Sequence, residues 1–199
     1  MDKERQYQDL SLFQMPAGFR GRSPILVQIW WIVQATFFRM SPDVFYGWRS
    51  LLLRAFGARI GKRVRIRSTT RVTYPWKLTI GDYVWVGDDC VFYNLGEIVL
   101  GSHVAIAHDV YFCTGLHDYR KIDFPIGQEP IRIEDEVWIT NDVFIGPGVT
   151  IGRGSIVGAR STVLNDLPEG MICYGNPAKA IKPRKMHEQT ARAEEERVR

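Results

Sequence analysis

An apolar residue recurs at every sixth position through the middle of this 199-residue chain, and this period restricts the fold more than any other feature. The longest run extends from Ile133 to Val163, and shorter runs with the same period begin at Ile60, Ile80 and Leu100. An amphipathic helix would require a period of 3.6 residues, whereas a longer fixed repeat is typical of a solenoid whose units stack around one continuous core. The predicted core positions are Ile60, Ile66, Val72, Leu78, Ile80, Val86, Phe92, Leu100, Ile106, Phe112, Ile133, Ile139, Ile145, Ile151, Val157 and Val163.

Glycine directly follows many of these apolar positions, at a density that a helix would not tolerate. The glycines are Gly61, Gly81, Gly87, Gly101, Gly146, Gly152 and Gly158. We interpret each six-residue unit as a short strand followed by a corner, and we expect glycine to supply the backbone conformations that a sharp corner needs. The sequence therefore predicts an all-β core, a parallel β-helix of hexapeptide repeats that occupies residues 58–170.

Residues 1–57 precede the repeat and carry two helix signals. Ser23 and Pro24 form an N-cap and first-turn pair, and a dense apolar run follows them as far as Phe38. The sequence Ser41-Pro42-Asp43 repeats this signal for a second helix that continues through Phe56. We predict an N-terminal helical segment.

Helices as apolar as these two have to be covered. In one interpretation they pack on the end of the β-helix or on a neighbouring subunit. In the other, Trp30, Trp31, Phe37 and Phe38 enter a membrane interface, where aromatic rings are favoured. The sequence leaves both interpretations open.

Residues 171–199 follow the repeat. The stretch Tyr174-Gly175-Asn176-Pro177 is typical of a turn, and the chain from Ala178 onward is charged and rich in alanine. We predict a C-terminal turn followed by a solvated helical tail.

The composition argues against several classes of protein. The net charge of +4 suits an anionic cofactor or lipid, but the sequence lacks the concentrated basic stripe of a nucleic-acid-binding protein. The three scattered cysteines have no metal or disulfide spacing and indicate reduced thiols. Because Met1–Asp9 is polar and the apolar window Ile25–Met40 is too short and too polar to cross a bilayer, we expect a cytoplasmic protein, at most peripheral at the inner membrane.

The six-residue period is lost between residues 113 and 132. A solenoid must extrude such an insertion, and long loops on a rigid scaffold carry function disproportionately often. The loop begins with Cys113-Thr114-Gly115-Leu116-His117-Asp118-Tyr119. It is the first place to look for catalytic residues.

Several stretches of the chain resemble a known family. They are Gly18-Phe19-Arg20-Gly21, Gln28-Ile29-Trp30-Trp31, Thr73-Tyr74-Pro75-Trp76-Lys77-Leu78, Cys113–Tyr119 and Gly175-Asn176-Pro177-Ala178-Lys179. With its repeats, the chain resembles the hexapeptide-repeat acyltransferases and, more narrowly, the colanic-acid-type capsular polysaccharide O-acetyltransferases, from about Gln8 to Pro183. The resemblance implies a left-handed helix, a homotrimer with active sites between subunits, and acetyl-CoA as donor. It implies as acceptor a sugar hydroxyl, in an oligosaccharide carried by a lipid at the inner membrane face.

The resemblance also implies the catalytic residue. His117 matches the family's histidine, which removes the proton of the attacking hydroxyl, a task that imidazole suits near neutral pH. Asp118 either orients the imidazole or caps the loop, and Asn94 either binds the acceptor sugar or forms a turn.

The positions that match the family's donor-binding residues lie in the second half of the chain. They are Trp138, Asn141, Gly158, Ala159, Leu164, Asn165, Lys179 and Lys182. We expect Ala159 to act through its backbone, and the two lysines to meet phosphates as point charges. Relatives commonly have Thr-Lys where Leu164-Asn165 stands, so a phosphate contact is expected to be lost there.

Two other functions fit the same scaffold. His103 and His108 have a spacing used by γ-class carbonic anhydrases, but zinc needs three such ligands and no histidine precedes His103. We therefore predict no metal. The second alternative is a non-catalytic β-helix that only assembles partners, against which the loop histidine and the donor-binding positions argue.

Overall fold

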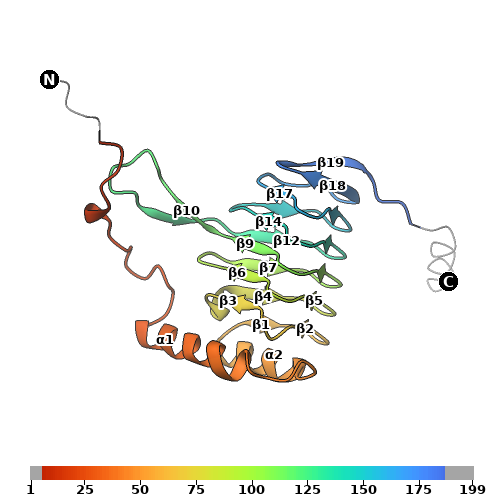
Figure 1. Cartoon of the computed structure of the whole chain (residues 1–199), viewed down its shortest axis with the longest axis horizontal. Coiled ribbons are helices and arrows are strands. Elements are labelled where there is room, and N and C mark those ends of the chain that lie inside the picture. The colour runs from red at the N-terminus through yellow and green to blue at the C-terminus, as the bar shows by residue number, and fades with distance from the viewer. Residues whose placement is uncertain (1–5, 187–199) are drawn as a thin grey trace.

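A computed structural model describes residues 6–186 of the chain. The repeat region forms a parallel β-helix, as predicted, in which short strands stack into three sheets (Figure 1). The first sheet contains β1 (Arg59–Ile60), β4 (Leu78–Ile80), β7 (Ile98–Leu100), β12 (Ile131–Ile133) and β15 (Thr150–Ile151). The second contains β2 (Arg65–Ile66), β5 (Trp85–Val86), β8 (Ala105–Ile106), β13 (Trp138–Ile139), β16 (Ile156–Val157), β18 (Met171–Gly175) and β19 (Ala178–Pro183). The third contains β3 (Arg71–Val72), β6 (Val91–Tyr93), β9 (Tyr111–Cys113), β14 (Phe144–Ile145) and β17 (Thr162–Val163).

Strand register stacks each repeated apolar residue on its counterpart in the next coil. Ile60 pairs with Ile80, and the rings of Phe92 and Phe112 lie parallel with their centroids 4.7 Å apart. Every position predicted for the core is buried. The six-residue period is therefore confirmed as the pattern that fills the interior of the solenoid.

The glycines of the repeat have a different role from the one predicted. Gly61, Gly81 and Gly87 do not have positive φ angles; the left-handed conformation falls two residues later, for instance at Arg63 (φ 52°) and Asp89 (φ 55°). A Cβ atom at Gly81 would lie 2.6 Å from the carbonyl carbon of Gly101. Glycine is needed here because adjacent coils approach too closely for a side chain, rather than because the corner requires its backbone freedom.

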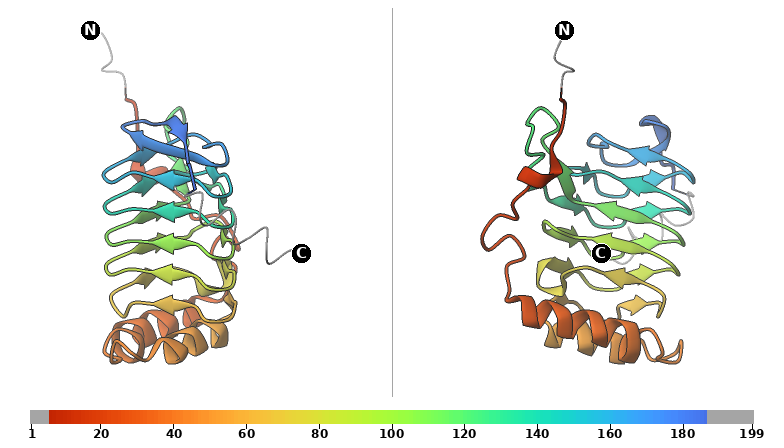
Figure 2. Two further views of the ribbon diagram at one scale, coloured as in Figure 1. Left: turned by 90° about the vertical axis from the view of Figure 1, so that its right-hand side faces the viewer. Right: turned by 60° about the vertical axis from the view of Figure 1, so that its left-hand side comes forward.

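Two helices cover the first coil at one end of the β-helix (Figures 1 and 2). The first helix, α1 (Pro24–Val33), continues into one π-helical turn, η2 (Gln34–Phe38), and the second, α2, spans Tyr46–Ala55. Ser23 caps α1 as predicted, through a 3.4 Å hydrogen bond from the amide of Leu26.

The predicted start of the second helix is wrong. The Ser41 hydroxyl donates to the carbonyl of Phe38, at the end of the preceding turn, instead of capping a new helix. Helix α2 begins only at Tyr46, and no side chain caps it. The Ser-Pro signal therefore marks the linker between the two helices.

Side chains of the two helices donate to one backbone carbonyl in each strand at the open edge of the first coil. Trp30 Nε1 donates to the carbonyl of Val72 at 2.8 Å, and Arg49 Nε donates to the carbonyl of Ile66 at 2.6 Å. The guanidinium of Arg54 donates to the carbonyl of Ile60. An exposed parallel edge would offer unpaired backbone groups to another chain, so these contacts close the β-helix at its base.

The opposite end of the β-helix is closed by strands, which corrects the predicted C-terminal helix. Strand β18 pairs in parallel with β16 and then turns into β19, which runs antiparallel to it. Residues 178–183 are therefore extended and residues 184–186 are not helical, whereas residues 187–199 of the predicted tail lie outside the described residues. Within residues 6–186, no helix has the length and apolarity that crossing a bilayer requires.

Candidate active site

The interruption of the repeat forms a β-hairpin that projects from the side of the β-helix (Figures 1 and 2). Its strands, β10 (Gly115–His117) and β11 (Ile126–Gln128), are antiparallel, and His117 pairs with Ile126. The hairpin leaves the coil after β9 of the third sheet and returns at β12 of the first sheet. It therefore stands at the corner between these two sheets.

His117 lies at the end of β10 with its ring fixed by the returning half of the hairpin. Its Nδ1 atom is 2.9 Å from the carbonyl oxygen of Phe124, and the two rings stack with centroids 4.3 Å apart. A carbonyl oxygen can only accept, so the proton of a neutral imidazole resides on Nδ1. The other nitrogen, Nε2, then carries the lone pair that a general base needs.

The N-terminal segment lies beside the hairpin and completes the surroundings of His117. Phe13 lies 6.3 Å from the imidazole, measured between ring centroids. The amide of Asp9 donates to the carbonyl of Ile122 at 2.8 Å, which attaches this segment to the hairpin. Neither Phe13 nor Phe124 was predicted, because nothing in the sequence indicates that residue 13 lies beside residue 117.

Lys77 holds the base of the hairpin against the N-terminal segment. Its ammonium donates to the carbonyl of Phe19 at 2.8 Å, to the carbonyl of Leu95, and to Gln128 of β11. Burial lowers the pKa of Lys77, while the nearby carboxylate of Glu97 acts in the opposite direction. One lysine thus ties three segments together beneath the candidate site.

Asp118 does not orient His117. Its carboxylate accepts a 2.8 Å hydrogen bond from Arg120 Nε and a 3.2 Å hydrogen bond from the Arg120 amide. These bonds from Arg120 lower the pKa of Asp118. Of the two predicted roles, the structure has the loop cap, and the carbonyl of Phe124 takes the orienting position.

Asn94 is fully buried and bonded to the backbone of the neighbouring coil. Its Oδ1 accepts from the amide of Tyr74 at 2.9 Å, and its Nδ2 donates to the Tyr74 carbonyl at 2.6 Å. The side chain has no surface to offer a sugar in this subunit. The predicted acceptor contact is therefore wrong for the single chain, and Asn94 instead shapes the coil beneath the hairpin.

Two of the predicted donor-binding residues, Trp138 and Lys182, lie in one row on the second sheet. Trp138 pairs with Ile156, which pairs with Ile172, which in turn pairs with Lys182, so these residues form one row across four strands. At the usual strand spacing this row is roughly 14 Å long. Trp138 and Lys182 are exposed at its two ends.

The other predicted donor-binding residues lie at two corners of the β-helix. Asn141 and Ala159 occupy the corner between the second and third sheets, where the carbonyl of Asn141 accepts from the amide of Arg160. Gly158 precedes Ala159, and Lys179 lies on β19 opposite Tyr174. Leu164 and Asn165 follow β17, at the corner from which the hairpin also projects. Within one chain, Leu164 and Asn165 therefore lie at the corner between the third and first sheets, which also carries His117. The row of residues that contains Trp138 lies on the second sheet, away from this corner.

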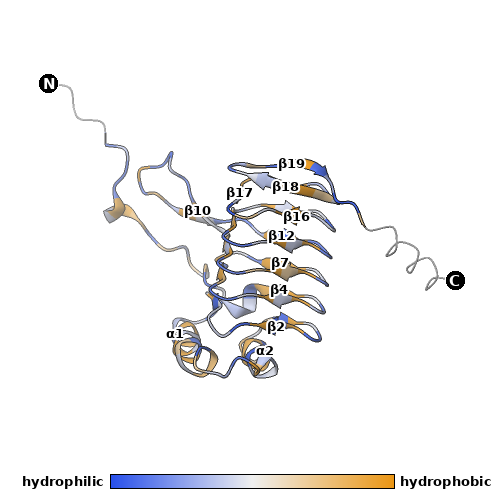
Figure 3. Ribbon diagram, turned by 45° about the vertical axis from the view of Figure 1, so that its right-hand side comes forward, coloured by the Kyte–Doolittle hydropathy of each residue, from blue (hydrophilic) through white to orange (hydrophobic). Residues whose placement is uncertain are grey.

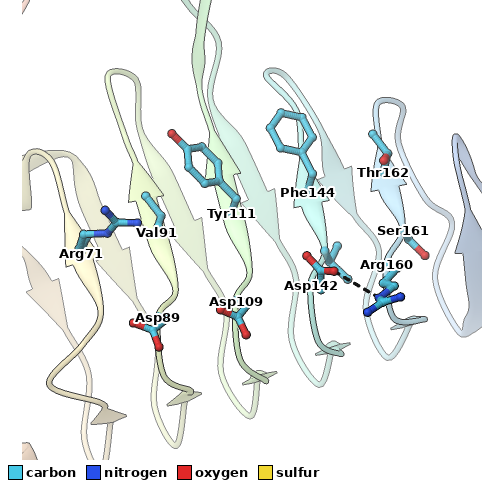
Figure 4. A pocket seen from close by; sticks show the side chains of 11 residues that line it. Arg71, Asp89, Val91, Asp109, Tyr111, Asp142, Phe144, Arg160, Ser161 and Thr162 are labelled. Atoms are coloured by element: carbon cyan, nitrogen blue, oxygen red, sulfur yellow. Dashed lines mark ion pairs between the residues drawn. The ribbon is translucent and has the colours of Figure 1, made fainter.

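A shallow groove runs along the outer face of the third sheet (Figure 4). Tyr111 and Phe144 stack along it with centroids 5.9 Å apart, and Asp142 forms a 3.4 Å ion pair with Arg160. None of the predicted donor-binding residues lines this groove, although Asn141 and Ala159 adjoin it in sequence. The groove connects the second-sheet corner with strand β9, which leads into the hairpin.

The two histidines of the zinc alternative have other contacts. His103 stacks on Tyr83 with centroids 5.0 Å apart, and His108 Nδ1 accepts from the amide of Asp88. Across residues 6–186, no three His, Cys, Asp or Glu side chains are placed so that they could hold a metal ion. The described residues therefore offer no ligand set for the hydratase.

Comparison with known proteins finds hexapeptide-repeat acetyltransferases that are similar to this chain over most of its length. Residues 130–165 match the family description of the bacterial transferase hexapeptide (six repeats). The chain is 55% identical over 177 residues to an Escherichia coli (strain K12) protein named as the colanic acid biosynthesis acetyltransferase WcaF. This match covers 89% of the chain and 97% of the relative.

Solved structures agree with the fold. The hexapeptide-repeat acetyltransferase VCA0836 of Vibrio cholerae, solved in complex with acetyl-CoA, is similar with a TM-score of 0.74 and 28% identity, over 81% of this chain and 88% of its own. A maltose O-acetyltransferase from Clostridium difficile 630 is similar with a TM-score of 0.69 and 27% identity, over 82% and 90% of the two chains. The repeats, the hairpin and the near full-length match together show that the chain belongs to the hexapeptide-repeat acetyltransferases of the WcaF family.

Proposed function

We propose that this acetyltransferase moves the acetyl group of acetyl-CoA to a sugar hydroxyl during exopolysaccharide synthesis, with His117 as general base. The observation that carries the proposal is the 2.9 Å contact between His117 Nδ1 and the Phe124 carbonyl, which leaves Nε2 free. The name of WcaF supports the pathway, and the names of the structural relatives support the donor and a saccharide acceptor.

The chemistry follows from the position of the imidazole. Nε2 takes the proton of the acceptor hydroxyl while the hydroxyl oxygen bonds to the thioester carbonyl carbon. The resulting tetrahedral intermediate collapses, the carbon–sulfur bond breaks, and the leaving thiolate takes the proton back from the imidazolium. The products are an acetyl ester and free coenzyme A. The Phe124 carbonyl stabilises the imidazolium that forms in the first step, because Nδ1 remains protonated throughout.

The row on the second sheet is the proposed path of the donor. Trp138 offers a flat apolar surface for the pantetheine arm, and the half-buried side chains of Ile156 and Ile172 can continue it. Lys179 and Lys182 stand on β19 at the end of the row, where they would meet the phosphates as point charges. Gly158 and Ala159 at the adjoining corner have little or no side chain, so coenzyme A can approach the backbone closely there.

A homotrimer explains why one chain separates these parts. His117 and Leu164-Asn165 stand at the corner between the third and first sheets, whereas Trp138 lies on the second sheet. If the hairpin of one subunit faces the second sheet of the next, the base and the thioester meet between subunits. Sedimentation equilibrium tests this: a trimer has three times the chain mass of 22.9 kDa.

The test of the function is acetyl transfer by the purified protein. Acetyl-CoA is supplied with saccharides, including polysaccharide repeat-unit fragments, and mass spectrometry detects the added acetyl group while a thiol reagent follows coenzyme A release. We expect His117→Ala to retain the assembly and to lose roughly 100-fold or more in turnover, the usual scale for loss of a general base.

A matched control is His103→Ala, which removes an exposed histidine that stacks on Tyr83 and lies between β7 and β8, at the corner between the first and second sheets rather than the corner that carries the hairpin. It should leave turnover within about twofold of wild type. Near-normal turnover of His117→Ala would refute the assignment of the base. Failure of the wild-type protein to release coenzyme A with any saccharide would refute the proposed reaction.

A further inference from the structure

The outer face of the two N-terminal helices is a large apolar surface at the base of the β-helix. Trp30 and Phe38 are fully buried against the first coil, so of the two open interpretations these two residues follow the one in which the helices pack on the end of the β-helix. Other residues of the two helices and of the linker between them are exposed. Figure 3 colours much of α1 as hydrophobic, whereas α2 is mixed. The exposed residues are Ile25, Ile29, Trp31, Ile32, Phe37, Met40, Val44, Phe45, Trp48 and Leu51. We call these ten residues the base surface.

The base surface has the pattern of an interfacial helix pair. Ile25, Ile29 and Ile32 recur at helical spacing on α1, opposite the buried Val27 and Trp30. Met40 is 80% exposed and Val44 is 75% exposed, values that are unusual for apolar side chains without a partner. Both helices lie across the end of the β-helix, so their outer sides form one face (Figure 1).

A strongly basic charge surrounds the base surface. Residues 20–65 contain nine arginines and lysines and one aspartate, a net charge of +8, whereas the whole chain carries +4. Arg22 and Arg39 are exposed immediately before α1 and at the end of η2, and Arg59, Lys62 and Arg63 are exposed on the first coil. The single aspartate, Asp43, is paired with Arg67 at 3.3 Å. The remainder of the chain is net negative.

We propose that the base surface docks on an anionic lipid bilayer, with α1 and α2 lying in the plane of the interface. Apolar and aromatic side chains would enter the acyl boundary, and the arginines would meet the lipid phosphates. The same charge disfavours a second copy of the chain as the occupant, because two such faces, each bordered by exposed basic side chains, repel each other. Docking requires neither His117 nor the acetyl donor, so it stands independently of the proposed reaction.

Vesicle flotation of the full-length protein tests the proposal. The protein is mixed with vesicles of phosphatidylcholine alone or of phosphatidylcholine with phosphatidylglycerol, and the fraction that floats is measured at low and high salt. We expect binding to the anionic vesicles that salt weakens. Replacing Arg22→Gln and Arg39→Gln should weaken binding roughly fivefold for each arginine. The triple variant Ile25→Ser, Ile32→Ser, Met40→Ser should weaken it roughly tenfold or more.

Matched controls lie away from the base. Arg132→Gln removes an exposed arginine of β12, and Ile181→Ser with Met186→Ser removes exposed apolar side chains near the opposite end. These variants should float like wild type, and circular dichroism confirms that each variant is folded. The proposal would be overturned if the wild-type protein stayed with the soluble fraction. It would also be overturned if the arginine variants and the triple variant of the base surface floated like wild type. A change in oligomer size in the triple variant would show that a second copy covers the surface instead.

Discussion

The imidazole of His117 donates from Nδ1 to the carbonyl oxygen of Phe124, seven residues further along the same hairpin, at 2.9 Å. The partner is a backbone atom, so this orientation does not depend on a second titratable group. The stacked Phe124 ring, with an interplanar angle of 7°, fixes the plane of the imidazole as well. The hairpin by itself therefore fixes the orientation of the imidazole and the tautomer in which Nε2 is unprotonated.

Asp118→Asn should retain turnover to within about threefold of wild type, because the Asp118 carboxylate is engaged by Arg120 rather than by His117. Steady-state kinetics of coenzyme A release measure this. Arg120→Gln, which removes the partner of the same contact, is the control and should behave alike. A loss near that of His117→Ala would show that the carboxylate acts on the imidazole after all.

Arg49→Met should lower the free energy of unfolding by about 3 kcal/mol, because the buried carbonyl of Ile66 loses its donor. The substitution keeps most of the side-chain volume and removes the guanidinium. Urea unfolding at fixed protein concentration measures the change. The control is Arg39→Met at an exposed position, for which a change below about 0.5 kcal/mol is expected. Equal stabilities of the two variants would contradict the edge-capping role of Arg49.

Gly87→Ala and Gly47→Ala should change stability in opposite directions. A Cβ atom at Gly87 would clash with the carbonyl of Ala107, so we expect a loss of about 1–3 kcal/mol. A Cβ atom at Gly47, within α2, meets nothing within 4 Å, and alanine there should add up to about 1 kcal/mol. Unfolding of the two variants under the same conditions gives both values. A stable Gly87→Ala would mean that the coils can move apart.

Acid should destabilise the protein partly through Asp88. Burial raises the pKa of Asp88, but hydrogen bonds from Arg67 and Thr69 and the charge of Arg67 outweigh it, so the pKa lies below its ordinary value. A carboxyl with a lowered folded-state pKa contributes stability above its unfolded pKa, near 4, and loses it as the pH falls through the folded value. Unfolding measured from pH 7 downward should show this loss, and Asp88→Asn should reduce its slope. An unchanged slope would exclude Asp88 as a contributor.

The sequence by itself determined the β-helix and the place where its repeat is interrupted, which carries the candidate site. Apolar residues spaced six apart fill the core of the solenoid from Ile60 to Val163, whereas an amphipathic helix needs a period of 3.6. The sequence could show this because the spacing of apolar residues is a local property of the chain. The break in that period located the loop of His117 for the same reason. The resemblance of short stretches to the acyltransferases was confirmed by the match to WcaF, which is 55% identical over 89% of the chain.

The tertiary structure decided every relation between distant parts of the chain. Phe13 lies beside His117, and Trp30 and Arg49 cap the first coil, because these contacts join segments that no local pattern connects. The roles of the glycines and of Asn94 were misread for the same reason, since each depends on the coil above or below. The C-terminal strand β19 overrode a helix-favouring composition because the last coil offered an edge to pair with.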